Sequence, residues 1–223
     1  MKIGLASNFQ DELENIEPIW EIYKDVVDKW TVVDSGSTDG TQEKLVSVVG
    51  DKLNLIESDK IQNIEFGYGY ARTQLVELSK GMDWVLIVDG DERMLPEDTD
   101  KIRPVIEANG SSDIIFLPRC HYQNWEMTEV EYGSMDHTGP DWTVAVAINP
   151  DWQPRLVKRT MRNGKSKVRF VNPVHEVVEG AENILQDVQN SPVIRHFGWM
   201  KSPERLKMIA NLCRKLSGME PIE

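Results

Sequence analysis

The sequence predicts an α/β domain: a mostly parallel central sheet flanked by helices, with a smaller irregular or antiparallel part in the C-terminal half. Three observations predict this class. Short apolar runs alternate with stretches of helical periodicity, one uninterrupted apolar run ends in acidic residues, and the alternation breaks down after Cys120. Strands that alternate with helices are typical of βαβ units, whose strands lie parallel in one sheet.

The regular alternation occupies the first half of the chain. Apolar residues recur at helical spacing between the apolar runs, so each pair of runs is joined by an expected helix. The expected strands are residues 2–6, 30–33, 53–56, 85–88 and 113–118, and the expected helices are 16–27, 42–49, 67–81 and 97–108.

The second half is less regular. Residues 125–152 are rich in aromatic, glycine, proline and acidic residues, which favours an irregular lid or acceptor region. Residues 155–159 and 167–171 flank Asn163-Gly164, a hairpin signal. We expect one domain over 1–223, with a nucleotide-binding half of about 1–118 and an acceptor-side half of about 119–223.

Composition limits the classes of partner. Of the 223 residues, 40% are hydrophobic and 28% charged, which is typical of a globular chain with a substantial core. A net charge of −12 argues against general binding of nucleic acid or anionic membranes. Two distant cysteines, no recognisable signal peptide and no apolar run long enough for a transmembrane segment lead us to expect a cytoplasmic protein.

Asp89 and Asp91 follow directly on the apolar run 85–88, with Gly90 between them. An apolar run without alternation indicates a strand buried on both faces, and in open α/β sheets ligands bind at the carboxyl ends of such strands. Two neighbouring carboxylates repel each other unless a cation lies nearby, and a divalent cation prefers oxygen ligands. The alternative is that the two acids only form a turn or cap the following helix.

Three segments, in this order, resemble the motifs of family 2 glycosyltransferases: residues 32–41, residues 67–72 and Asp89-Gly90-Asp91, the last matching the D-x-D motif. The resemblance covers roughly the first 120 residues. Residues 154–156 and 174–176 are similar to an acceptor-side pattern of one bacterial and phage subgroup, with less specificity. The resemblance implies a GT-A fold and transfer of a sugar from a nucleotide-diphosphate donor, with inversion at the anomeric carbon.

The nucleotide-binding candidates lie at expected strand ends and at a helix start. They are Ser7, Asp34, Asp39, Arg72 and Asp89. A carboxylate at a strand end can accept hydrogen bonds from a base or a ribose, and an arginine fork suits a phosphate or a neighbouring carboxylate. Turn formation and helix capping are the alternative roles of Asp34 and Asp39.

The resemblance implies Mn²⁺ or Mg²⁺ as the cofactor. Asp91 is expected to bind the metal directly, and Asp89 to contact it through water or to bind the ribose. A late histidine, either His175 or His196, could complete the metal shell, although a lone histidine beside an apolar residue is more often structural. The metal would neutralise charge on the leaving diphosphate.

An inverting transfer needs a base near the acceptor hydroxyl. Glu176 is the first candidate by resemblance, and Asp136 and Asp141 are alternatives. The expected partners are a nucleotide-diphosphate sugar, with uridine as the expected nucleoside, and a glycan or other hydroxyl-bearing acceptor.

Two readings from other classes stay open. One is a phosphatase of the haloacid dehalogenase type, in which a strand ending in Asp-x-Asp carries a nucleophilic aspartate. That family has its motif on the opening strand, whereas here three expected strands come first. The other is a sugar-nucleotide-binding protein without catalytic activity.

Overall fold

The computed structural model describes residues 1–57, 60–122, 151–172, 177–186 and 189–198, with separate residues beyond position 203. Its helices are α1 (Ile16–Tyr23), α2 (Thr41–Val49), α3 (Lys60–Leu78) and α4 (Pro96–Ala108), with short 3-10 turns η1 (Leu13–Asn15) and η2 (Gly50–Lys52). In the described ranges no helix is long and apolar enough to cross a membrane.

The strands form one large sheet and two small hairpins. Those of the first half are β1 (Ile3–Phe9), β2 (Lys29–Asp34), β3 (Leu53–Glu57), β4 (Trp84–Ile87), β5 (Glu92–Arg93) and β6 (Ile114–His121). Those of the second half are β7 (Asp151–Lys158), β8 (Met161–Arg162), β9 (Lys165–Ser166), β10 (Arg169–Val171), β11 (Val177–Glu179), β12 (Ile184–Leu185) and β13 (Ile194–His196).

The large sheet has the order β3-β2-β1-β4-β7-β6-β13-β5, and β12 pairs with β6. The first four strands are parallel. Strand β7 then lies between β4 and β6 and is antiparallel to both, while β13 is parallel to β6. The expected mostly parallel sheet with an antiparallel part is therefore confirmed.

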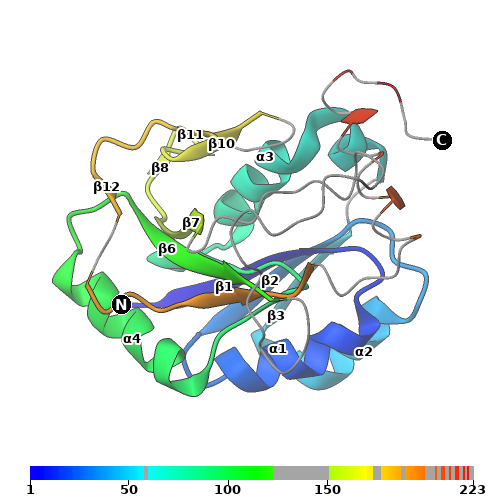
Figure 1. Ribbon diagram of the computed structural model, residues 1–223, viewed down its shortest axis with the longest axis horizontal. Coiled ribbons are helices and arrows are strands. Elements are labelled where there is room, and N and C mark those ends of the chain that lie inside the picture. Colours follow the sequence, from blue (N-terminus) through cyan, green and yellow to red (C-terminus); the bar gives the residue numbers. More distant parts are fainter. Residues whose placement is uncertain are drawn as a thin grey trace.

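Helices cover both faces of this sheet. Figure 1 shows α1, α2 and α4 on one face, and α3 with the β10–β11 hairpin on the other. Each face has its own apolar core, since Ile19, Trp30 and Ile106 belong to one buried cluster and Leu75 and Phe170 to the other. Burial on both faces explains why the strand residues 84–88 are apolar without alternation.

The parallel strands bring their carboxyl ends to one edge. Strand β2 ends at Asp34, and Asp89 follows just beyond β4, with β1 between the two strands. Residues far apart in the sequence are thereby collected at the edge where ligands bind in open α/β sheets.

The sequence predicted a long hairpin over 155–171. Its turn is confirmed, but its two expected strands do not pair with each other. Asn163 and Gly164 both have positive φ and connect β8 to β9. Residues 155–158, however, belong to β7 and lie in the central sheet, while β10 pairs with β11. Leu156 and Val157 are fully buried in the sheet, and this burial outweighs a local hairpin pairing.

Helix α3 begins earlier than expected. It starts at Lys60 and is interrupted at Gly67, which has φ 78° and ψ −175°. Glycine adopts this left-handed region without the steric cost that a Cβ would add. The helix start that the sequence predicted at residue 67 coincides with this interruption. Arg72 lies on the part of α3 that follows it.

Candidate functional site

The loop after β4 carries Asp89 and Asp91, and hydrogen bonds with neighbouring side chains hold its backbone in place. Arg93, itself buried, donates from Nη1 to the carbonyl oxygens of Gly90 (2.8 Å) and Glu92 (2.7 Å). The backbone N–H of Asp89 donates to Glu92 Oε2 at 3.1 Å. The loop therefore has a defined conformation that presents Asp89 and Asp91 at the sheet edge.

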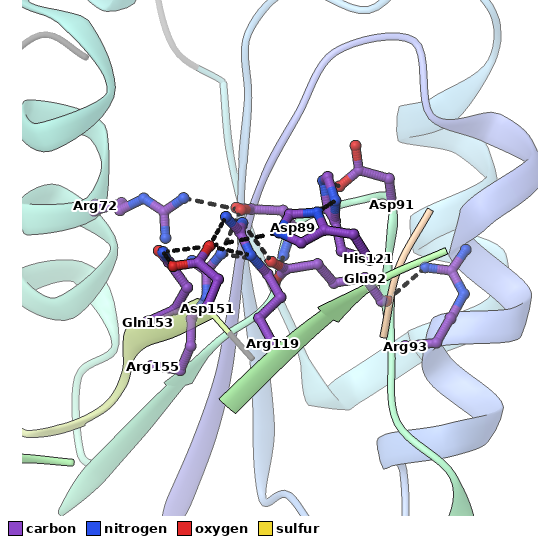
Figure 2. Close-up of polar contacts among 11 residues, drawn as sticks. Arg72, Asp89, Asp91, Glu92, Arg93, Arg119, His121, Asp151, Gln153 and Arg155 are labelled. Carbon is purple, nitrogen blue, oxygen red and sulfur yellow. Dashed lines mark hydrogen bonds and ion pairs between the residues drawn. The ribbon is translucent and has the colours of Figure 1, made fainter. Parts of the chain in front are cut away.

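Two arginines approach the carboxylate of Asp89. Arg72 Nη2 and Arg155 Nη2 each donate to Asp89 Oδ2 at 2.8 Å. Figure 2 shows these arginines reaching Asp89 from α3 and from β7. Of the two partners expected for Arg72, a phosphate or a neighbouring carboxylate, this structure has the carboxylate.

Glu92 and Arg155 lie beneath Asp89 and are both fully buried. Arg155 donates to Glu92 Oε1 at 2.6 Å, and Arg119 Nη1 donates to the same oxygen at 3.3 Å. Burial raises the pKa of Glu92 to about 8; the nearby charge of Asp89 adds to the shift and Arg119 opposes it. The ionised form of this carboxylate therefore depends on its arginine partners.

Asp91 lies beside His196. The Oδ1 atom of Asp91 is 3.6 Å from His196 Nε2, and the backbone N–H of Phe197 donates to the Asp91 carbonyl at 2.8 Å. The approach is set by strand pairing, because β13 pairs with β5 with His196 opposite Glu92. A residue more than 100 positions later in the chain thus meets the second acid of the D-x-D motif.

Gly198 packs closely against the ring of His196. A Cβ atom on Gly198 would lie 2.4 Å from His196 Cε1, 2.5 Å from His196 Nε2 and 3.2 Å from Asp91 Oδ2. A side chain at this position would therefore collide with the His196 ring and lie beside the Asp91 carboxylate. Glycine permits this close packing because it has no Cβ.

The donors fit a divalent cation in part. Asp91 supplies carboxylate oxygens and His196 an imidazole nitrogen, a combination that Mn²⁺ accepts. Among the described residues no three His, Cys, Asp or Glu side chains form a complete metal-binding group. The two protein donors would therefore leave most coordination positions to a substrate and water, as is usual where a cation is held by few carboxylates and substrate phosphates.

The loop after β2 is organised by Asp34. Its buried carboxylate accepts hydrogen bonds from the backbone N–H groups of Gly36 and Ser37, from Ser37 Oγ and from Gln42 Nε2, at 2.6–3.1 Å. Here Asp34 therefore orders the turn, and a direct contact with a nucleotide would have to replace one of these donors.

Two further nucleotide-binding candidates have local partners. Asp39 accepts hydrogen bonds from the N–H and hydroxyl groups of Thr41 and from the N–H of Leu13. Ser7 is fully buried, and its hydroxyl accepts a hydrogen bond from the indole of Trp30 at 3.1 Å. In this structure Asp39 links the start of α2 to η1, and Ser7 links β1 to β2.

Several expected residues lie outside the described ranges. These are the base candidates Glu176, Asp136 and Asp141 and the metal-ligand candidate His175. Conversely, the structure brings ionisable residues to the site that the sequence did not single out: Glu92, Arg119, His121, Asp151 and Arg155. The one signal available for Arg155 was its place in the acceptor-side pattern.

Solved structures with this architecture define the fold class as GT-A. TarS of S. aureus (residues 1–349) superposes with a TM-score of 0.57 at 16% identity, covering 100% of this chain and 67% of that one. Glucosyl-3-phosphoglycerate synthase from Mycobacterium tuberculosis, in a complex with Mn²⁺, UDP-glucose and phosphoglyceric acid, superposes with a TM-score of 0.55 at 14% identity, covering 98% of this chain and 80% of that one.

The sequence itself matches the model of glycosyl transferase family 2 over residues 26–173. The chain therefore belongs to this family, as its motifs implied, and the phosphatase reading loses its support. A TPR repeat-containing protein of Synechococcus elongatus is 24% identical over 98% of this chain. The chain spans about half the length of that curated relative, 52%.

Proposed function

We propose that this chain is a metal-dependent, inverting glycosyltransferase that moves a sugar from a nucleotide-diphosphate donor, with uridine as the nucleoside, to an acceptor hydroxyl. The observation that carries the proposal is the approach of Asp91 to His196 beside Gly198, at the edge where the parallel strands end. Family membership supports the reaction class.

Asp91 and His196 would hold Mn²⁺ or Mg²⁺, which supplies Lewis-acid stabilisation of charge on the leaving diphosphate. The M. tuberculosis synthase that shares the fold binds Mn²⁺ and UDP-glucose, which supports both the cofactor and the nucleoside. Because the chain is strongly acidic, a cation at this edge would also reverse the local charge that otherwise repels a diphosphate.

Asp89 has a different role in this proposal. Since Arg72 and Arg155 both donate to its Oδ2 atom, its carboxylate is held in place and partly neutralised. It would orient the ribose or a metal-bound water rather than bind the cation directly. The acceptor base is assigned to Glu176, with Asp136 and Asp141 as alternatives, because an inverting transfer needs a carboxylate near the acceptor hydroxyl.

The proposal is tested by the binding of UDP to the purified chain with and without Mn²⁺, measured by calorimetry. We expect Mn²⁺ to strengthen UDP binding in the native protein but not in Asp91→Asn, with the fold retained. Asp51→Asn is the matched control, because Asp51 is exposed in η2 at the opposite edge of the sheet. Unchanged Mn²⁺-dependent UDP affinity in Asp91→Asn would contradict the metal assignment.

Activity separates the enzyme from a non-catalytic binder. A panel of nucleotide sugars, screened by thermal shift with Mn²⁺, identifies the donor because a bound ligand raises the melting temperature by mass action. The preferred donor is then incubated with the protein, and release of the nucleoside diphosphate is followed. Release that needs both Mn²⁺ and Asp91 is expected, whereas binding without release would favour the binder.

A further inference from the structure

His121 and His196 form a hydrogen-bonded imidazole pair at the site. Their Nδ1 atoms are 2.9 Å apart, and the ring planes are nearly perpendicular, at 83°. They come from neighbouring parallel strands, β6 and β13, in which the two residues are direct register partners. Strand pairing therefore fixes the relative position of the two rings.

Each ring turns its other nitrogen towards a carboxylate. His196 Nε2 lies 3.6 Å from Asp91 Oδ1, and His121 Nε2 lies 3.6 Å from Asp151 Oδ2. The four side chains form a row from Asp151 through the two imidazoles to Asp91. At the Asp151 end Arg119 donates to the carboxylate, and at the Asp91 end Gly198 packs against the His196 ring.

Asp151 is a firmly ionised carboxylate. Arg119 donates to its Oδ2 atom from Nη2 and Nε, and Gln153 Nε2 lies 2.9 Å from both of its oxygens. Burial by itself raises the pKa of Asp151, but the close contact with His121 and the charge of Arg119 outweigh it. The pKa therefore lies well below its usual range.

The ionised carboxylate determines the direction of the hydrogen bonds. A neutral imidazole has one donor and one acceptor nitrogen. Facing Asp151, His121 carries its proton on Nε2, because a lone pair there would be repelled by the negative charge. Its Nδ1 is then the acceptor, so His196 donates from Nδ1 and carries a lone pair on Nε2. A cation held between this Nε2 and Asp91 would remove the repulsion that the lone pair otherwise meets from the carboxylate.

We infer that His121 is a positioning residue for the metal site: its imidazole holds the ring of His196 so that Nε2, together with Asp91, is presented to a divalent cation. The inference rests on the proposed function, since it takes Asp91 and His196 as the cation's ligands. Hydrogen bonds to the second nitrogen of a ligating histidine typically fix its tautomer and orientation, and their loss weakens metal binding by about 10–100-fold.

The test uses Mn²⁺ alone, with free Mn²⁺ quantified by electron paramagnetic resonance. His121→Phe keeps a ring but lacks the acceptor, and we expect a loss of affinity of about 10–100-fold. His121→Asn places an amide oxygen near the Nδ1 position and should restore most of the affinity. Ile115→Val, in the buried core of the same strand, is the control and should bind Mn²⁺ like the native chain.

The outcomes separate the two proposals. If Asp91→Asn loses Mn²⁺ while His121→Phe binds it as the native chain does, the positioning role is wrong and the metal site stands. If Asp91→Asn binds Mn²⁺ normally, the proposed metal site itself is wrong. Nitrogen NMR of the native protein with Mg²⁺ gives a reading without any variant: a proton on Nδ1 of His196 is expected, and a proton on Nε2 would overturn the inference.

Discussion

Arg155 donates to Glu92 at 2.6 Å, and both side chains are completely buried between the sheet and the loop that carries the D-x-D motif. In the described part of the chain, the Nε and Nη1 atoms of Arg155 have no hydrogen-bond partner. The arginine is thus committed to two carboxylates, Glu92 and Asp89. The pair links β7 to β5, and its two residues are 63 positions apart in the sequence.

Removing one partner of the Arg155–Glu92 pair should destabilise the folded protein. Arg155→Met leaves Glu92 buried without its nearest cation, and we expect the free energy of unfolding to fall by roughly 3–5 kcal/mol. The measurement is urea denaturation. Glu92→Gln added to Arg155→Met should recover part of the loss, because the buried carboxyl group that lost its cation is then replaced by a neutral amide. Losses that simply add in the double variant would contradict this account of the pair.

Gly198→Ala should weaken the metal site without unfolding the protein. The new Cβ would lie within about 2.5 Å of the His196 ring, and His121 holds that ring in place. We expect Mn²⁺ affinity to fall by about 10–100-fold, as when a ligand loses its orientation. Gly110→Ala is the matched control, because its Cβ would meet only the carbonyl of Ile106 at 3.7 Å. Similar Mn²⁺ affinities in the two variants would contradict the prediction.

The pair of Asp98 with Arg195 should give the protein an acid-sensitive contribution to stability. Arg195 Nη1 donates to Asp98 Oδ2, which ties β13 to the first turn of α4. Burial by itself raises the pKa of Asp98, but the hydrogen bonds from Arg195 and Lys101 outweigh it, and the pKa lies below its ordinary value. The folded protein therefore binds this proton less readily than the unfolded chain does.

The lowered pKa of Asp98 determines how this contribution to stability changes with pH. The stabilisation is present above the ordinary aspartate pKa of about 4 and is lost as the pH falls below it. We expect Asp98→Asn to be less stable than the native chain by about 3 kcal/mol at pH 7, because it leaves Arg195 without its partner. Denaturation from pH 7 to pH 3 should show this difference shrinking, whereas a constant difference would count against it.

Asp39 should contribute through its hydrogen bonds to the start of α2. It accepts from the N–H and hydroxyl groups of Thr41, so Asp39→Ala removes a helix-start acceptor at a cost of about 1 kcal/mol. Asp39→Asn keeps an acceptor oxygen and should cost much less. Thermal or urea denaturation of the two variants checks this, and equal losses would show that charge rather than the hydrogen bond matters.

Much of the fold was predictable because it depends on local patterns. Uninterrupted apolar runs and helical spacing placed the strands and helices of residues 1–118 to within a few positions, apart from the early start of α3 and the two-residue strand β5. The hairpin over 155–171 failed for the opposite reason. Local turn chemistry correctly placed Asn163-Gly164, but it carries no information on whether Leu156 finds a better partner in β4.

The candidate site also has a part that the sequence predicts and a part that only the tertiary structure shows. The sequence by itself determined the family, the α/β class and the two acids at the end of a buried strand, because a few adjacent residues carry each of these signals. Only the tertiary structure decided which side chains meet them: His196 beside Asp91, Arg155 beneath Asp89 and Glu92. These partners arrive on β7 and β13, and the pairing of distant strands follows from the burial of the whole sheet rather than from any local pattern.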